Sequence, residues 1–171
     1  MEFREITAKE FSTNPFASIG QEWMLLTAEK MVNGKMTANT MTAAWGGLGH
    51  LWNKDVAFIF VRPQRYTKEF VDESDRFTLS FFGGEKKEEL TYLGRVSGRD
   101  EDKITKSGLH LKEMGGAPGF EEADTVLVCR KLYRQTLTAD CFIDQEVCHS
   151  SYPKADFHDV YVGEIEKIYI K

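Results

Sequence analysis

The sequence is poor in cysteine, in proline and in long apolar stretches. Its three cysteines, Cys129, Cys141 and Cys148, are an odd number without CxxC spacing. This argues against a disulfide framework and a zinc site, and it favours reduced thiols in a cytoplasmic protein. The apolar run at residues 56–61 is far shorter than the roughly 18 residues of a membrane span. Met1 is followed at once by the charged residues Glu2 and Arg4, so no secretory leader is expected. The cysteine pattern leaves no metal site to be expected either.

Positive charge is also in short supply. The 22 Lys and Arg residues against 27 Asp and Glu give a net charge of -5. This balance repels nucleic acid and anionic membranes, so neither is expected as a partner, and any anion site has to be local. At 171 residues, 42% hydrophobic and 29% charged, the chain has the size and composition of one soluble domain. No repeat or linker interrupts it, and we interpret residues 1–171 as a single domain.

Strand patterns dominate what is present. Residues 23–28 and 36–44 flank Asn33 and Gly34, a pair that favours a tight hairpin because both residues tolerate positive φ. Residues 56–62 are apolar on both faces, as in a central strand. Further strands are expected at residues 76–82, 124–137, 138–144 and 159–171. The few helices do not alternate with these strands, so the prediction is a mainly β protein, an antiparallel barrel with inserted helices.

The segments between the strands are shorter and richer in glycine. Helices are expected at residues 66–74, at 85–93 with Gly94 as the C-cap, and within the loop 98–108. The string GGLGHLW, residues 46–52, lacks the third glycine of a dinucleotide-binding loop, and its glycines are expected to permit a tight turn instead. The sequence leaves open whether residues 108–122 cover a site or only cross the barrel end.

The most informative motif is RPQRYT, residues 62–67. Arg62 ends a strand, Pro63 stops it, and Arg65 and Thr67 then stand at the N-terminus of the next helix. Two guanidinium groups, a hydroxyl and the first backbone N–H groups of a helix can converge on one point, which is what a phosphate dianion requires. The alternative is a surface pair of arginines with Thr67 as a helix N-cap.

The string NTMTAAW, residues 39–45, places small side chains, hydroxyls and an amide ahead of a large aromatic ring. Small residues let a flat ligand approach the backbone, whose polar groups can read the edge of that ligand. The alternative is a barrel strand with Thr40 and Thr42 on its wet face.

Two further polar residues lie at positions of interest. Lys103 stands in a glycine-flanked loop, where a solvated charge is the default interpretation. His158 precedes the last strand, which Gly163 interrupts, and a close backbone approach or a bulge is expected there. A capping histidine is the alternative for His158.

Taken together, several blocks resemble the flavin reductase-like, FMN-binding split-barrel family, and its flavoredoxin branch in particular. The blocks are NTMTAAWGGLGHLW, VAFIFVRPQRYTKEFVDES, RFTLSFF, YLGRVSGRDEDK, SGL and HDVYVGEIEKIYI. Their order and approximate spacing agree with the family from about residue 23 to the end. The resemblance implies a six-stranded antiparallel Greek-key split barrel that works as a homodimer, with FMN at or near the subunit interface.

The resemblance also assigns roles to residues. Arg62, Arg65 and Thr67 would hold the FMN phosphate, and no side chain is expected to act as a nucleophile. A histidine at the place of His158 is found in many relatives with differing roles, so a catalytic part for it is a possibility of the resemblance only. The implied cofactor contacts are Asn39, Thr40, Met41, Thr42, Trp45, Arg62, Arg65, Thr67 and Lys103.

The implied function is an FMN oxidoreductase. NADH or NADPH would reduce the flavin, which would pass electrons to free flavin, an iron centre or a protein acceptor. Ala43 and Ala44 stand where flavin-reducing relatives often carry serine or cysteine, which leaves the redox partner open. The alternatives are a flavoredoxin-type electron carrier without nicotinamide activity of its own, and a flavin-binding module that has lost redox function.

Overall fold

Antiparallel pairing joins most strands into one sheet in the computed structural model, which describes residues 2–171. The strand order is β3-β2-β6-β9-β10-β5-β4, and β1 pairs with β10 outside this path. The strands are β1 (Arg4–Ile6), β2 (Met24–Val32), β3 (Lys35–Ala43), β4 (Gly46–Leu51), β5 (Lys54–Val61), β6 (Arg76–Phe81), β7 (Leu111–Glu113), β8 (Pro118–Phe120), β9 (Thr125–Thr136) and β10 (Asp159–Ile170). The helices are α1 (Pro15–Ala17), α2 (Tyr66–Glu73), α3 (Lys87–Arg95), α4 (Lys103–Ser107) and α5 (Gln145–Ser151), with a π-helical turn at Ser18–Glu22 and a 3-10 turn at Ala139–Cys141.

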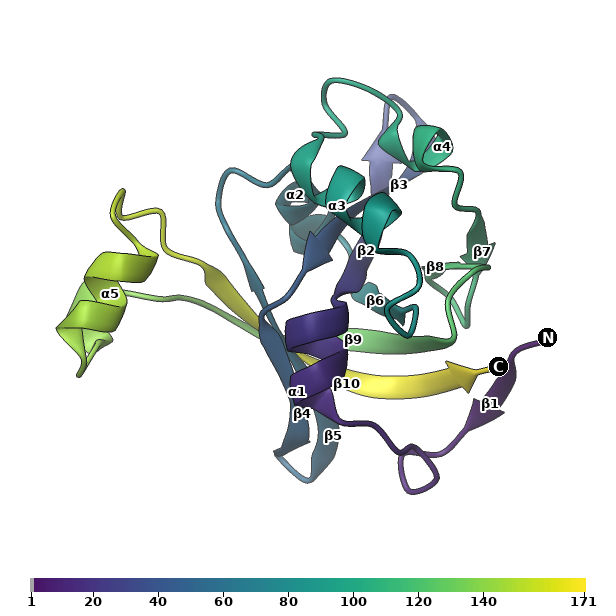
Figure 1. The fold of residues 1–171 in the computed structure, drawn as a ribbon, viewed down its shortest axis with the longest axis horizontal. Coiled ribbons are helices and arrows are strands. Elements are labelled where there is room, and N and C mark those ends of the chain that lie inside the picture. The colour runs from purple at the N-terminus through teal and green to yellow at the C-terminus, as the bar shows by residue number, and fades with distance from the viewer. Residues whose placement is uncertain (1) are drawn as a thin grey trace.

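The topology is that of the predicted barrel. Strands β5, β6, β9 and β10, which follow one another within this sheet, lie in the order β6-β9-β10-β5. The first of the four therefore lies beside the last, as in a Greek key. Six of the predicted strands correspond to β2, β3, β5, β6, β9 and β10. Helices α2, α3 and α4 gather on one side of the strands, next to β3 (Figure 1). The fold is therefore mainly β and antiparallel, as predicted, with β1 and β4 as further strands of the sheet.

Strands β2 and β3 form a hairpin, and β2 places apolar side chains on both faces of the sheet. Asn33 and Gly34 adopt φ values of 51° and 78° and form the predicted hairpin turn between β2 and β3. Successive residues of a strand face opposite sides. Leu26 therefore belongs to the apolar cluster inside the barrel, whereas Leu25 belongs to a second cluster on the outer side, beneath Leu90 of α3.

Two predictions about glycines were wrong. The glycines of residues 46–52 do not form a turn, because residues 46–51 pair with β5 as the edge strand β4. Their missing side chains leave room for Phe58 of β5. A Cβ at Gly49 would lie 3.5 Å from that ring, and one at Gly46 would lie 2.7 Å from the Phe58 carbonyl oxygen. Gly94 does not cap α3 but lies inside it. Its missing side chain lets β3 approach the helix, since a Cβ there would lie 3.1 Å from the Thr42 Cβ.

The strand predicted at residues 138–144 is absent. Strand β9 ends at Thr136, opposite Asp159 of β10, and the chain then leaves the sheet. Asp144 ends the segment as the N-cap of α5, where its carboxylate accepts from the backbone N–H groups of Glu146 and Val147. Residues 137–158, which we name the arm, thus project from the barrel and carry α5 at the far end (Figure 1).

Residues 108–122 pack against the outer apolar cluster and also reach a cavity. Leu109, Met114 and Phe120 are buried in the outer apolar cluster, and the hydroxyl of Thr78 in β6 donates to the Pro118 carbonyl at 2.5 Å. Leu111 of the same segment reaches a cavity described below. Among residues 2–171 there is no helix with the length and apolar character that a membrane crossing requires.

Candidate functional site

A cavity of about 240 Å³ opens beside the C-terminal end of β3. It lies where β3, the end of β5, the start of α2 and the start of β10 meet. Five of the nine predicted cofactor residues line it, together with His158. The lining residues are Met41, Thr42, Ala43, Ala44, Trp45, Phe60, Arg62, Arg65 and His158. We name this the aromatic cavity, because its walls include Trp45, Phe60 and the imidazole.

The walls of the aromatic cavity are planar rings at stacking distances. The ring centroids of Trp45 and His158 lie 5.0 Å apart with an interplanar angle of 43°. Phe60 meets the imidazole edge-on at 6.5 Å. Trp45 is 49% exposed, so it presents a large apolar surface at the mouth of the cavity. Such a wall suits a flat, largely apolar guest with some polar edges.

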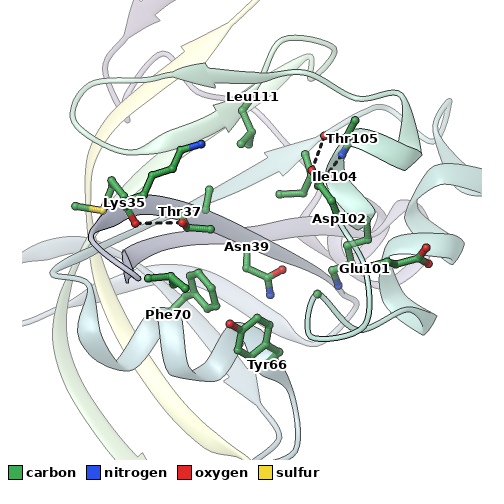
Figure 2. A pocket seen from close by; sticks show the side chains of 15 residues that line it. Lys35, Thr37, Asn39, Tyr66, Phe70, Glu101, Asp102, Ile104, Thr105 and Leu111 are labelled. Atoms are coloured by element: carbon green, nitrogen blue, oxygen red, sulfur yellow. Dashed lines mark hydrogen bonds between the residues drawn. The ribbon is translucent and has the colours of Figure 1, made fainter.

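A second cavity, of about 500 Å³, follows β3 toward its N-terminal end. Its walls include Tyr66 and Phe70 of α2, Leu111 of β7, and two predicted cofactor residues, Asn39 and Lys103. Figure 2 shows Asn39 projecting from β3 toward Tyr66. The predicted residues are therefore distributed over two cavities along one strand rather than gathered in a single one.

The C-terminal end of α3 holds two cations between these cavities. The Lys103 ammonium donates to the carbonyl oxygens of Leu93 at 2.8 Å and Val96 at 2.9 Å. The Arg65 guanidinium donates to the adjacent carbonyl of Gly94 at 2.6 Å. The last carbonyls of a helix lack backbone partners and carry partial negative charge, so they attract positive side chains. Arg65 lines the aromatic cavity and Lys103 the larger one, so both cavities reach the same helix end.

These two cations have no acidic partner among residues 2–171. Lys103 is only 4% exposed, and burial, followed by the charge of Arg65, lowers its pKa to about 8. Burial and then the charge of Arg62 lower the pKa of Arg65 below its ordinary value. A buried ammonium beside a half-buried guanidinium, without a counter-ion, is costly. An anion bound between them would relieve this cost.

Arg62 is arranged differently from Arg65. Its guanidinium is paired with the Asp156 carboxylate, donates to the Ser151 carbonyl at 2.9 Å, and lies 5.2 Å from the centre of the Tyr152 ring. All three partners belong to the arm. Arg62 therefore reaches the cavity with its charge already balanced, whereas the sequence predicted that both arginines would serve the same anion.

Three other predicted residues have structural partners. The Asn39 amide donates to the Thr67 hydroxyl at 2.9 Å, and both residues are buried. A Cβ on Gly98 would lie 2.3 Å from the Asn39 amide oxygen, so this contact ties β3 to α2 and to the loop before α4. The Thr40 hydroxyl is bonded to β2. The side chains of Thr40 and Thr67 line neither cavity, and Thr67 is no N-cap, because Arg65 holds that position.

His158 reaches the aromatic cavity as a neutral ring. Burial, followed by the charge of Arg62, lowers its pKa to about 4, against the opposing effect of the Asp156 carboxylate. Its Nδ1 lies 2.8 Å from the Tyr152 hydroxyl oxygen. At pH 7 the ring therefore offers hydrogen bonds but no charge.

Comparison with known proteins bears on the family and the fold of this chain. A sequence profile described as "Flavin reductase like domain" matches residues 16–171. The chain belongs to the flavin reductase-like family. No curated protein sequence matches it.

Solved structures share the fold of this flavin reductase-like chain. An FMN-binding domain of a flavin reductases-like enzyme from Shewanella baltica superposes with a TM-score of 0.68 at 15% identity, over 99% of this chain and 77% of that one. A flavoredoxin from Methanosarcina acetivorans gives 0.64 at 26% identity, over 87% and 68%. A protein from Shewanella frigidimarina described as having a split barrel domain gives 0.62 at 16% identity, over 92% and 72%. These likenesses confirm the predicted split barrel.

Sequence reasoning missed several residues that line or support the aromatic cavity. Phe60 belongs to an apolar strand, and its pattern gave no sign of which side chains would face a cavity. Tyr152 and Asp156 follow Arg62 by about 90 residues, and no local spacing connects them. The one available signal was the position of Asp156 two residues before His158.

Proposed function

We propose that this chain binds FMN and catalyses electron transfer from NADH or NADPH through the bound flavin. The observation that carries the proposal is the pair of cations at the end of α3, which lacks an acidic partner and lies beside an aromatic cavity. A phosphate at one end and a flat ring system at the other match these two features. The FMN-binding neighbours from Shewanella baltica and Thermus thermophilus support the same cofactor.

The cationic end fits a phosphate group. Lys103 donates two of its three N–H bonds to carbonyls and Arg65 donates one of its five, so donors remain at both side chains. Charge-assisted hydrogen bonds from ammonium and guanidinium groups to phosphate are among the strong ones in proteins. Arg62 would add a third positive charge at the edge of this site, although Asp156 already balances it.

The aromatic end fits part of the cofactor. Its volume of about 240 Å³ falls below the roughly 300–1,000 Å³ of sites that enclose a whole ligand. FMN would therefore extend beyond it, toward the end of α3. Trp45 and Phe60 would flank the ring system. Strand β3 ends the strand order, so its outward N–H and C=O groups could hydrogen-bond the polar edge of the ring.

The chemistry would belong to the cofactor. When bound, FMN accepts hydride and transfers one or two electrons, and the protein supplies binding, orientation and electrostatics. The residues of this chain would hold the phosphate, flank the ring and keep neutral donors near it, and none would act as a nucleophile. Reduced flavin would pass its electrons to free flavin, an iron centre or a protein, in a cytoplasmic setting where the three free thiols stay reduced.

A spectroscopic titration tests FMN binding. Wild-type protein stripped of any bound flavin is titrated with FMN, and we expect quenched flavin fluorescence and a saturable isotherm. Arg65→Ala should weaken binding, whereas Arg99→Ala, an exposed arginine paired with Glu69, should leave it unchanged. A wild-type protein that does not bind FMN would contradict the proposal and would favour a module without flavin chemistry.

Stopped-flow mixing tests the electron donor. The FMN-loaded protein is mixed with NADH or NADPH without oxygen, and we expect bleaching of the flavin band at a useful rate with one of them. Bound flavin that neither nucleotide bleaches, yet dithionite does, would identify an electron carrier without nicotinamide activity of its own.

We further propose a homodimer. Large apolar side chains are exposed on the arm and around the barrel: Ile143 fully, Val147 at 48%, Trp52 at 53% and Tyr133 at 42%. Monomeric proteins rarely leave so many large apolar side chains exposed to water. Light scattering after gel filtration should give twice the mass of 19.6 kDa, and the double variant Ile143→Asp, Val147→Asp should give the monomer mass. A wild-type protein of monomer mass at 50 μM would refute this.

A further inference from the structure

The contact between the arm and the aromatic cavity runs through two buried side chains. Tyr152 and His158 are each 7% exposed, and their only side-chain hydrogen bond within residues 2–171 is the one between the Tyr152 hydroxyl and Nδ1 of His158, at 2.8 Å. Tyr152 stands at the C-terminus of α5. Its ring centroid lies 4.8 Å from that of Phe157 and 5.2 Å from the Arg62 guanidinium, so these neighbours restrict the orientation of the ring and of its hydroxyl.

Both groups of this pair are neutral near pH 7. Burial raises the pKa of the Tyr152 phenol above its ordinary value, and the pKa of His158 is lowered to about 4. The charged groups nearest to the pair, Arg62, Arg65 and Asp156, contribute to these shifts. A neutral imidazole carries one proton, on either Nδ1 or Nε2, and the hydrogen bond at one nitrogen decides which.

The surroundings of the phenol decide the direction of the hydrogen bond. A buried hydroxyl must donate its proton to an acceptor, and Nδ1 of His158 is the only side-chain acceptor that Tyr152 contacts within residues 2–171. If Nδ1 carried the proton instead, the Tyr152 hydroxyl proton would be left without an acceptor among the described side chains. Nδ1 therefore accepts, and the ring proton resides on Nε2.

The opposite edge of the imidazole belongs to the cavity. His158 lines the aromatic cavity beside Trp45, and within the described part of the chain Nε2 has no hydrogen-bond partner. We infer that Tyr152 is a positioning residue: it fixes His158 in the Nε2–H tautomer, so that the cavity presents a neutral hydrogen-bond donor to an acceptor atom of its ligand. Under the proposed function, on which this ligand assignment rests, the acceptor is a carbonyl oxygen or ring nitrogen of the flavin or of the group stacked on it.

The tautomer can be read without any cofactor. Long-range proton–nitrogen NMR spectra of the flavin-free protein at pH 7 distinguish the two neutral tautomers and the imidazolium ion, and His158→Gln identifies the signals. We expect wild-type His158 to be protonated at Nε2 only. Tyr152→Phe should turn this signal into a mixture of tautomers. The matched control is Tyr161→Phe, which also removes a buried phenol hydrogen bond, the one to Asp72 at 2.6 Å, and it should leave the His158 spectrum unchanged.

A binding measurement completes the test. Tyr152→Phe should weaken FMN binding about two- to tenfold, as for the loss of one neutral hydrogen bond, and Tyr161→Phe should not. Wild-type signals of an Nδ1–H tautomer or an imidazolium ion would overturn the inference, and so would a Tyr152→Phe spectrum identical to wild type. If the wild type shows the Nε2–H tautomer but binds no FMN, the proposed function fails while the role of Tyr152 stands.

Discussion

The pH dependence of FMN affinity is a direct test of the buried ammonium at the end of α3. The pKa of Lys103 is lowered to about 8 from 10.5, and a phosphate dianion beside it would raise the pKa again, because an opposite charge favours the protonated form. Affinity should therefore be full below pH 8 and fall as the pH rises through 8. The phosphate has a second pKa near 6, so it is mainly a dianion from pH 7 to pH 9.

The size of the pH effect on FMN affinity follows from the fraction of protein molecules in which Lys103 is protonated before FMN binds. At pH 9 about one molecule in ten carries the Lys103 charge, so the dissociation constant should be about tenfold higher than at pH 7, or about 1.4 kcal/mol. Isothermal titration calorimetry at pH 7, 8 and 9 measures this, and buffers of different ionisation enthalpy should reveal proton uptake at pH 8 to 9. The Lys103→Arg variant keeps its positive charge over this range, so its affinity for FMN should be the same at pH 7 and pH 9.

Two results would refute the reasoning. One is a wild-type dissociation constant that is the same at pH 7 and pH 9. The other is an equal loss of affinity in Lys103→Arg, because the titrating group would then lie elsewhere.

The same linkage between proton binding and folding acts on the free energy of unfolding of the protein without FMN. The cost of burying the charged form, about 3 kcal/mol, is fully present below pH 8 and is relieved as the pH rises toward 10.5.

Further predictions concern the other residues of the site. Arg65→Ala should weaken FMN binding by about 1.5–3 kcal/mol through loss of a charge-assisted contact, measured by fluorescence quenching; equal affinities of this variant and Arg99→Ala would remove Arg65 from the phosphate site. Gly98→Ala should lower the free energy of unfolding by about 1–3 kcal/mol, because its Cβ would lie 2.3 Å from the Asn39 amide oxygen. Urea denaturation measures this, with Gly20→Ala as the control, since no atom lies within 4 Å of a Cβ there; equal midpoints would contradict the packing argument.

The amino-acid sequence by itself determined the strands of the barrel and one end of the site. Alternating apolar residues have a period that only a strand satisfies, and the Asn33-Gly34 pair favours one type of turn. The approach of Arg65 to a helix start also follows from local spacing, since Pro63 ends the preceding strand. These features depend on residues within a few positions of one another, which is why they could be predicted.

The tertiary structure alone decided which polar groups meet. Arg62 is balanced by Asp156 from the arm, and Lys103 is bound to the carbonyls of Leu93 and Val96. Residues 46–51 form a strand because they pair with β5, and residues 138–144 form none because no neighbouring strand pairs with them. The charge balance of a side chain and the pairing of a strand depend on partners that are remote in sequence, and only the folded chain brings those partners within hydrogen-bonding distance.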